Sequence, residues 1–324
     1  MRGDSLKNRM VIILFALITI VTGCNSEHFE PINPHQSFIA SVSILEPSIT
    51  FFDTKGDEIA RWNLDKAYTG ATLIPHDRIL IYGHQLPEAD IYELSTGKKI
   101  KSIETGLGTT NAHYNDEEEL LFLTNSVKNH VASYDQYGNL MKELPIGDYP
   151  MSMDSYKGNL YIINFKDETL SVIDMKSLEL EHEWPISKSS NGLQIVEENN
   201  TIWIGGHGSG SQPNESVKVM NLENGQIVKE IKVSQMPVEF SKYNNEVYVI
   251  NHGSNELVVC DIEGNILWRK EVGANPFNVK RFKQYVVVAG FDDHTIYFLK
   301  EGEIEHFVKT KNGPFHLLVR EVQS

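Results

Sequence analysis

A spacing of about 40 residues recurs along most of this 324-residue chain. Four turns lead through a proline into a short apolar stretch, and the intervals are 87, 39 and 38 residues between Pro150, Pro237, Pro276 and Pro314. A second landmark is an apolar stretch that ends in a polar residue before a turn. Its intervals are 40, 42, 39, 47, 40 and 39 residues, between Asp53, Glu93, Asp135, Asp174, Asn221, Asp261 and Lys300. Because two independent landmarks give one period, we interpret the chain as a tandem repeat.

Each repeat contains three or four short stretches that are rich in Val, Ile, Tyr and Phe. Residues 160–165, 247–252 and 285–290 are examples, and turns with Gly, Asn, Asp or Lys separate such stretches. After residue 36, no segment has the 3.6-residue periodicity of an amphipathic helix. A period near 40 with four strands predicts an all-β chain, folded as a seven-bladed β-propeller of four-stranded blades.

Three repeats carry a more specific pattern. The segments LFLTN (121–125), LYIIN (160–164) and VYVIN (247–251) are each followed, about ten residues later, by an Asp. This pattern resembles the YVTN-type, WD40-like β-propeller repeats of bacterial and archaeal surface proteins. The resemblance covers roughly residues 37–324, and in other repeats a Gly stands near the Asn position: Gly83, Gly206 and Gly290. It implies an architecture much more than an activity.

Both ends of the repeat region hold an incomplete blade. Residues 37–64 contain three strand-like stretches without an inner strand, whereas residues 313–322 provide an inner strand without a following blade. We therefore expect the N- and C-terminal segments to pair and to close the ring, which removes open sheet edges. The six continuous blades are expected at about 65–105, 106–147, 148–187, 188–233, 234–273 and 274–311.

The first 24 residues predict a location. Arg2, Lys7 and Arg9 precede an apolar run of 12 residues, 10–21, which is shorter than the roughly 20 residues that a membrane-spanning helix needs. Residues 21–24, Val-Thr-Gly-Cys, resemble the lipobox of bacterial lipoproteins. That resemblance implies a signal peptide at 1–23 and diacylation of Cys24, with an ordinary signal peptide as the alternative.

We therefore expect three parts: the signal peptide at 1–23, the lipidated Cys24 with a tether at 24–36, and the propeller at 37–324. Acyl chains would anchor the mature protein to a bacterial cell membrane on its extracytoplasmic side. Asn25 stands where Asp would signal inner-membrane retention, and the choice between a Gram-positive and a Gram-negative membrane stays open.

Charge and composition exclude several classes of function. The net charge is −15, and removal of residues 1–23, with three basic and one acidic side chain, lowers it to −17. Such acidity argues against nucleic acid as a partner. Two cysteines provide neither a disulfide scaffold nor a Cys₄ zinc site. The chain also lacks a P-loop, a GxGxxG motif and a GxSxG motif, and no cofactor is predicted.

The inner strands predict a set of channel residues. Two positions after each turn proline, the side chain is expected to point to the propeller axis, and the polar residues in this register are Asn111, Ser152, Glu239, Asn278 and His316. Glu239, Asn278 and His316 come from three consecutive blades and could bind a cation or polarise a carbonyl. The competing interpretation is a water-filled channel lined by solvated polar groups.

The loops of one face form a second candidate site. Three histidines follow a second strand, at His84, His207 and His252, and could surround the channel opening and bind a metal or an anion. Turn chemistry is the competing interpretation, because Asn and His tolerate the backbone that such turns need. Residues 205–216, rich in Gly and Ser, are expected to form an exposed loop.

Two functions from different classes remain. The first is a non-enzymatic binding or scaffold module that holds a protein, peptide or glycan in the cell envelope. The second is a lactonase-type hydrolase, which the resemblance to propeller lactonases suggests through a channel-mouth metal or carboxylate. No second channel carboxylate accompanies Glu239 in the expected register, so the first is favoured.

Overall fold

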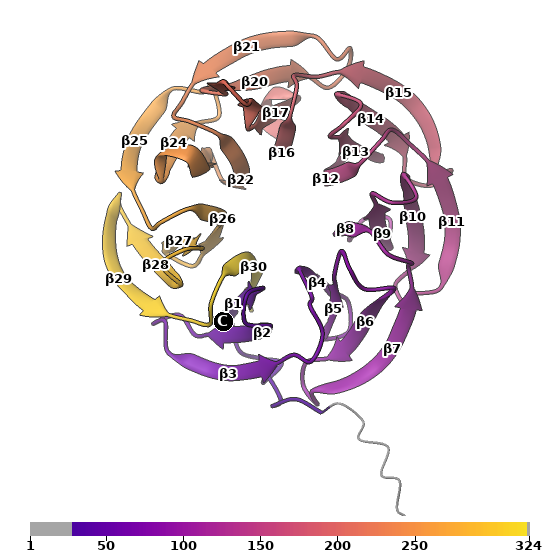
Figure 1. Cartoon of the computed structure of the whole chain (residues 1–324), viewed down its shortest axis with the longest axis vertical. Coiled ribbons are helices and arrows are strands. Elements are labelled where there is room, and N and C mark those ends of the chain that lie inside the picture. Colours follow the sequence, from indigo (N-terminus) through magenta and orange to yellow (C-terminus); the bar gives the residue numbers. More distant parts are fainter. Residues whose placement is uncertain (1–27, 323–324) are drawn as a thin grey trace, which may run out of the picture.

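The computed structural model describes residues 28–322, so the expected signal peptide and the acylation site Cys24 lie outside the described residues. These residues form a ring of seven four-stranded antiparallel sheets around a central axis (Figure 1). The predicted all-β propeller with seven blades is confirmed. Helix within residues 28–322 is confined to two single turns, η1 (Glu197–Asn199) and η2 (His252–Ser254).

Blades 1 to 3 each begin with their innermost strand. Blade 1 contains β4 (Gly70–Ile74), β5 (Arg78–Tyr82), β6 (Glu88–Glu93) and β7 (Lys98–Glu104). Blade 2 contains β8 (Thr109–Asn115), β9 (Leu120–Asn125), β10 (His130–Asp135) and β11 (Leu140–Pro145). Blade 3 contains β12 (Pro150–Tyr156), β13 (Asn159–Asn164), β14 (Thr169–Asp174) and β15 (Glu179–Pro185).

Blades 4 to 6 repeat this order. Blade 4 contains β16 (Ser190–Val196), β17 (Thr201–Gly206), β20 (Ser216–Asn221) and β21 (Ile227–Lys232). Blade 5 contains β22 (Pro237–Tyr243), β23 (Glu246–Asn251), β24 (Glu256–Asp261) and β25 (Ile266–Glu271). Blade 6 contains β26 (Pro276–Phe282), β27 (Tyr285–Gly290), β28 (Thr295–Lys300) and β29 (Glu303–Lys309).

Blade 7 combines the two ends of the described chain. Its inner strand is β30 (Pro314–Arg320), and its other strands are β1 (Phe38–Ser43), β2 (Ser48–Phe52) and β3 (Glu58–Asn63). Strand β30 pairs antiparallel with β1, with Leu318 opposite Ala40 and Arg320 opposite Phe38. The predicted closure between the terminal segments is therefore confirmed, and every inner strand has a hydrogen-bonded neighbour.

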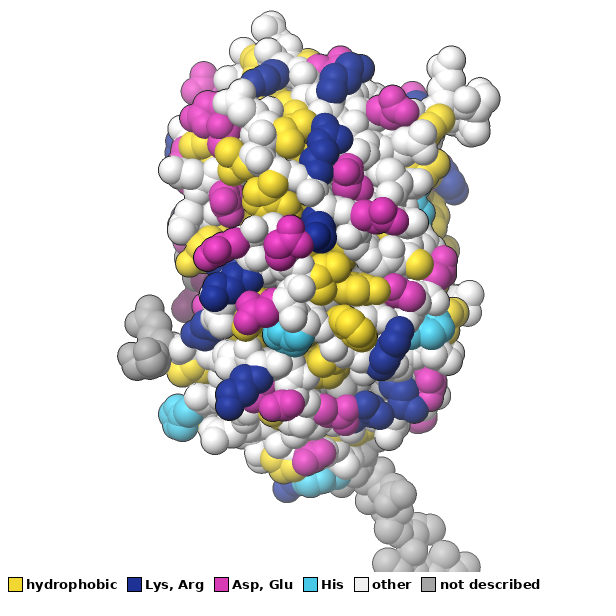
Figure 2. Space-filling model, turned by 90° about the vertical axis from the view of Figure 1, so that its left-hand side faces the viewer, with side chains coloured by type: hydrophobic (Ala, Val, Ile, Leu, Met, Phe, Trp, Pro, Cys, Tyr) yellow, Lys and Arg dark blue, Asp and Glu magenta, His cyan; other side chains and the backbone are white. Residues whose placement is uncertain are grey.

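The place of a strand within its blade determines its burial. All residues of the second strands β5 and β27 are buried, because adjacent blades pack against both of their faces. The outer strand β29 instead alternates between exposed and half-buried residues, since only one of its faces meets the protein. Figure 2 shows the side of the disc over β25 and β29, where basic and acidic side chains are interspersed with hydrophobic ones.

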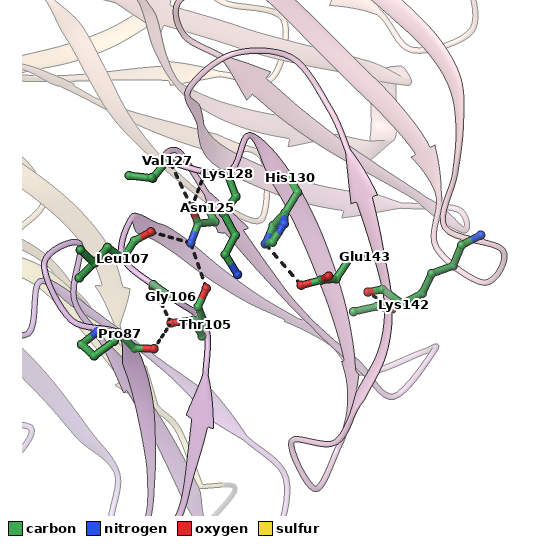
Figure 3. A network of polar contacts seen from close by, with 11 residues as sticks. Pro87, Thr105, Gly106, Leu107, Asn125, Val127, Lys128, His130, Lys142 and Glu143 are labelled. Carbon is green, nitrogen blue, oxygen red and sulfur yellow. Dashed lines mark hydrogen bonds and ion pairs between the residues drawn. The ribbon is translucent and has the colours of Figure 1, made fainter.

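The Asn of the YVTN-like segments has a structural role. Asn125 at the end of β9 is buried, and its amide donates to the carbonyls of Thr105 and Leu107 at 3.2 and 3.0 Å (Figure 3). Its Oδ1 accepts from the backbone N–H groups of Val127 and Lys128. Asn125 therefore ties its own turn to the loop that connects blades 1 and 2, and this supports the interpretation as turn chemistry.

Lysines of the outer strands link neighbouring blades. Lys142 on β11 donates to the Ser177 carbonyl in the next blade at 2.6 Å, and Lys229 on β21 donates to the Glu263 carbonyl at 2.5 Å. Each acceptor lies in the turn before the next outer strand. These contacts hold adjacent blades side by side at the rim, and the buried strands supply the core.

Residues 28–36 differ from the predicted tether. The ring of Phe29 stacks on Trp62, Ile32 is 2% exposed, and the Ile32 N–H donates to the Leu94 carbonyl at 2.8 Å. Arg320 of β30 also donates to the Asn33 carbonyl at 2.6 Å. These residues therefore pack against blades 7 and 1 rather than forming a free linker, because Phe29 and Ile32 bury apolar surface there.

Two further features complete the fold. The expected exposed loop at 205–216 is shorter than predicted, because Gly205 and Gly206 are the buried end of β17 and Ser216 begins β20. The loop contains a two-stranded ribbon, β18 (Gly208–Ser209) paired with β19 (Gln212–Pro213). Between residues 28 and 322 there is no helix with the length and apolar character needed to cross a membrane.

Candidate functional site

The seven inner strands surround a cavity of about 590 Å³. All five residues expected to face the channel, Asn111, Ser152, Glu239, Asn278 and His316, line this cavity. Ala71 and Gly192, at the same register in the other two blades, line it as well. The volume lies within the range of about 300–1,000 Å³ that is typical of small-molecule sites.

A register shift near the start of the inner strands brings extra side chains to the cavity. In blade 6, Pro276 lies opposite Gly290 and Asn278 lies opposite Ala289, so Phe277 is the additional residue of a β-bulge. Successive residues of a regular strand point to opposite faces, but both Phe277 and Asn278 line the cavity. The bulge therefore places an aromatic ring beside the amide.

Glu239, Asn278 and Lys280 form a connected polar group on blades 5 and 6. The Asn278 amide donates to Glu239 Oε1 at 3.2 Å, and Lys280 Nζ lies 3.6 Å from the same oxygen. Burial raises the pKa of Glu239, while Lys280 and the hydrogen bond from Asn278 oppose the shift. The carboxylate is thus already partly neutralised by its own neighbours.

His316 is neutral at physiological pH. Burial and the nearby Lys280 ammonium lower its pKa to about 4, against the opposing effect of a hydrogen bond to the Ala71 backbone. A neutral imidazole that donates through one nitrogen has an acceptor at the other. His316 can therefore accept a hydrogen bond but cannot supply a positive charge near pH 7.

A second ring of channel side chains was not identified from the sequence. His113, Asp154, Gln194 and Lys280 also line the cavity. They stand two residues after Asn111, Ser152, Gly192 and Asn278 respectively, where a regular strand again points to the same face. The two-residue alternation of the inner strands was the signal that could have identified them. The expectation that no second channel carboxylate accompanies Glu239 is wrong, because Asp154 also lines the cavity.

His113 and Asp154 form an interacting pair on blades 2 and 3. Burial lowers the pKa of His113 and raises the pKa of Asp154, and their mutual attraction opposes both shifts. His113 Nε2 lies 2.7 Å from Ser155 Oγ, and Asn115 also donates to this hydroxyl at 2.9 Å. Ser155 is not among the described residues that line the cavity, so its hydroxyl is not placed to act as a nucleophile there. Its contact with His113 instead orients the imidazole.

A cluster of aromatic rings lies beside this cavity, at the loop end of blades 6 and 7. The Phe277 ring lies 5.3 Å from Phe291 and 5.1 Å from Phe315, and all three side chains are half-buried. Phe277 and Phe315 line the cavity. Three adjacent aromatic rings that stay partly exposed provide an apolar surface next to the polar group of Glu239, Asn278 and Lys280.

The structure brings only two of the three rim histidines together. The rings of His207 and His252 are 5.8 Å apart, and His252 lies 4.5 Å from Phe277. Burial lowers the pKa of both, with His207 adding to the shift at His252. His84 lies elsewhere, 3.0 Å from Ser126 Oγ. His84, on blade 1, is therefore not a neighbour of His207 and His252, which lie on the adjacent blades 4 and 5, and binding of a metal or an anion by these histidines stays a prediction.

The side chains that could coordinate a metal ion are not clustered in the described part of the chain. Within residues 28–322, no three His, Cys, Asp or Glu side chains are grouped closely enough to hold one. The cavity combines hydrogen-bond acceptors, one ammonium group and an aromatic surface. This combination suits non-covalent recognition of a polar ligand with an apolar face.

Comparisons with known proteins support the fold. A scan against protein-family models and a search of curated proteins found no match. A functionally unknown protein from Desulfotomaculum acetoxidans DSM 771 has a similar structure, with a TM-score of 0.73, 10% identity, and coverage of 87% of this chain and 98% of that chain. Dihydro-heme d1 dehydrogenase NirN, solved in complex with DHE, gives a TM-score of 0.67 at 15% identity, over 87% of this chain and 65% of that chain. Similarity at this level of identity establishes a shared propeller fold and does not assign an activity.

Proposed function

We propose that this protein is a binding module of the bacterial cell envelope, anchored through lipidated Cys24, that holds a protein, peptide or glycan at the mouth of its central cavity. One observation carries the proposal: the half-buried rings of Phe277, Phe291 and Phe315 adjoin a polar cavity of about 590 Å³. Partly exposed aromatic groups next to convergent polar groups are typical of recognition sites.

The scaffold suits such a role because the binding groups are rigidly placed. Glu239, Asn278 and His316 extend from paired β-strands of three consecutive blades. A site on paired strands is pre-organised, so a ligand does not have to order it on binding. The mature charge of −17 favours cationic macromolecular partners over anionic ones at low ionic strength.

Site-specific photocrosslinking on intact cells tests the location of the binding site. A photoreactive phenylalanine analogue placed at Phe291 is expected to capture a partner through the cavity mouth. The same analogue at Phe307, which is 59% exposed on the outer strand β29, is the matched control and is expected to capture none. Equal capture from both positions, or capture from Phe307 alone, would contradict the proposed site.

Membrane fractionation tests the anchor separately. The Cys24→Ala variant is expected to leave the membrane fraction and to lose labelling by a radioactive or clickable fatty acid. The second cysteine, Cys260, is buried in blade 5, so Cys260→Ala serves as the matched control that keeps both properties. Unchanged fractionation of the Cys24→Ala variant would refute lipid anchoring.

The hydrolase alternative has two supporting observations. Glu239 and Asp154 both line the cavity, and burial raises the pKa of each, a property that general acids and bases often have. A screen of lactones and esters, with and without Ca²⁺, tests this alternative. Turnover that disappears in Glu239→Gln would overturn the binding-module proposal in favour of an enzyme.

A further inference from the structure

The cavity wall of blade 6 contains a buried acceptor that lacks a donor. Asn278 is 5% exposed, and no group among residues 28–322 donates a hydrogen bond to its Oδ1, although its amide is bonded to Glu239. A buried acceptor without a partner is unfavourable, and because this oxygen has almost no exposed surface, a ligand group can donate to it only after the Asn278 side chain turns toward the cavity. Neutral His316, on the neighbouring blade, provides a second acceptor.

The charges around this acceptor restrict the ligand. An incoming cation would meet Lys280, which already lies 3.6 Å from Glu239 and lowers the pKa of His316. An incoming anion would meet two carboxylates that line the cavity, Glu239 and Asp154. A neutral ligand with several hydroxyl donors avoids both repulsions and satisfies the acceptors.

The aromatic rings of the cavity restrict the class of ligand further. Phe277 and Phe315 line the same cavity as Asn278 and His316, and their ring centroids are 5.1 Å apart. The negative face of an aromatic ring attracts weakly positive C–H groups. A sugar ring has hydroxyl donors at its edge and C–H groups on its faces, so it matches both parts of the site.

We propose that the ligand of this cavity is a neutral glycan. One sugar ring would pack on Phe277 and Phe315, and its hydroxyl groups would donate to Asn278 Oδ1 and to His316 or Glu239. This inference rests on the proposed binding function and specifies its ligand class. Asn278 and Phe277 then determine specificity, the first by hydrogen bonding and the second by stacking.

Binding measurements on the full-length protein test the inference. The probes are neutral oligosaccharides of glucose, mannose, galactose and N-acetylglucosamine, oligosaccharides of uronic acids, and lysine-rich peptides. We expect a neutral oligosaccharide to bind, with affinity lowered at least tenfold by Asn278→Ala and by Phe277→Ala. Phe277→Tyr, which keeps the aromatic face, should retain binding, and Phe307→Ala should not affect it.

Hydrogen exchange provides a measurement that needs no variant. Addition of the bound oligosaccharide to the wild-type protein should slow amide exchange in β22, β26 and β30 more than in β29, since the first three strands line the cavity. Protection that does not differ between these strands would overturn the site, even if a variant fails to fold.

The other outcomes separate this inference from the proposed function. Binding of the lysine-rich peptides instead of a neutral oligosaccharide would overturn the glycan inference and leave the binding module intact. The glycan inference would also be overturned, and the binding module would stay supported, if no probe binds while the analogue at Phe291 crosslinks a protein partner. If no probe binds and crosslinking at Phe291 captures nothing, both proposals are wrong.

Discussion

The ring of Phe29 stacks on the indole of Trp62 with centroids 4.8 Å apart and planes inclined by 12°. This contact joins the segment before β1 to the outer strand β3 of the composite blade, and the Trp62 indole N–H also donates to the Glu30 carbonyl at 2.9 Å. The stacked pair lies at the junction of blades 7 and 1, where Phe29 also contacts Tyr92.

We expect Phe29→Ala to lower the free energy of unfolding by about 2 kcal/mol, because it removes a half-buried ring from Trp62 and Tyr92. Urea denaturation monitored by tryptophan fluorescence measures the change. Phe307→Ala is the same substitution at an exposed position and should cost less than about 1 kcal/mol. Equal losses in the two variants would show that residues 28–36 do not stabilise the propeller.

Removal of residues 312–324 should abolish cooperative unfolding or cause aggregation. The deletion removes β30, including the buried Leu317 and Leu318, and leaves an edge of β1 unpaired. Loss of these two side chains alone is worth about 4 kcal/mol or more. Thermal denaturation and light scattering provide the measurement, with deletion of 321–324, which leaves β30 intact, as the control. An unchanged melting midpoint after the longer deletion would contradict closure by β30.

Asp90→Ala should destabilise the protein by about 3 kcal/mol. Asp90 is fully buried in blade 1, 2.8 Å from Lys66 Nζ, and it accepts hydrogen bonds from Tyr68 and Ser102. Burial alone would raise its pKa, but the contacts with Lys66, Ser102 and Tyr68 outweigh burial and lower it. Removing the carboxylate takes away the charged acceptor of three hydrogen bonds, those from Lys66, Tyr68 and Ser102.

The same substitution at a half-buried turn residue, Asp135, is the control. Among residues 28–322, Asp135 accepts hydrogen bonds from Tyr137 and Asn139 of its own turn, and Asp135→Ala should cost about 1 kcal/mol. Chemical denaturation at pH 7 compares the two variants. A loss for Asp90→Ala no larger than that for Asp135→Ala would mean that the buried group contributes little.

Stability should fall on acidification in part because of His316. Its pKa is about 4 in the folded protein and 6.5 as the ordinary value, so between these values the unfolded chain binds a proton that the folded chain does not. The free energy of unfolding therefore rises with pH across this interval and falls as the pH drops through it. The loss between pH 7 and pH 4.5 is on the order of 2–3 kcal/mol.

A double comparison isolates this contribution from other titrating groups, including His113 and Asp154. His316→Gln should lose less stability between pH 7 and pH 4.5 than the wild type does, whereas His35→Gln, at an exposed position, should lose as much as the wild type. Urea denaturation at both pH values gives the four free energies. If His316→Gln retains the full pH dependence, His316 is not protonated more easily in the unfolded chain.

The sequence by itself determined the repeat and its consequences. The 40-residue period, the alternation of strands and turns, and the incomplete blades at the two ends predicted seven blades with closure by the terminal segments. These features can be predicted from the sequence because they depend on interactions between residues that are close together in the chain. Asp261, for example, accepts from the backbone N–H of Asn265 four residues later, and such a turn forms within one segment of the chain. The register of the inner strands likewise placed Asn111, Ser152, Glu239, Asn278 and His316 at the cavity, since strand periodicity is fixed by the backbone.

Only the tertiary structure decided which of these side chains meet. The contact between Glu239 and Asn278 joins residues 39 positions apart, and its geometry depends on the bulge of β26 and on the angle between two blades. The same is true of the Phe277, Phe291 and Phe315 cluster, of the packing of Phe29 on Trp62, and of the separation of His84 from His207 and His252. A sequence pattern gives the direction of a side chain within its own strand. The distance to a side chain on another blade is set by how the whole ring packs and closes.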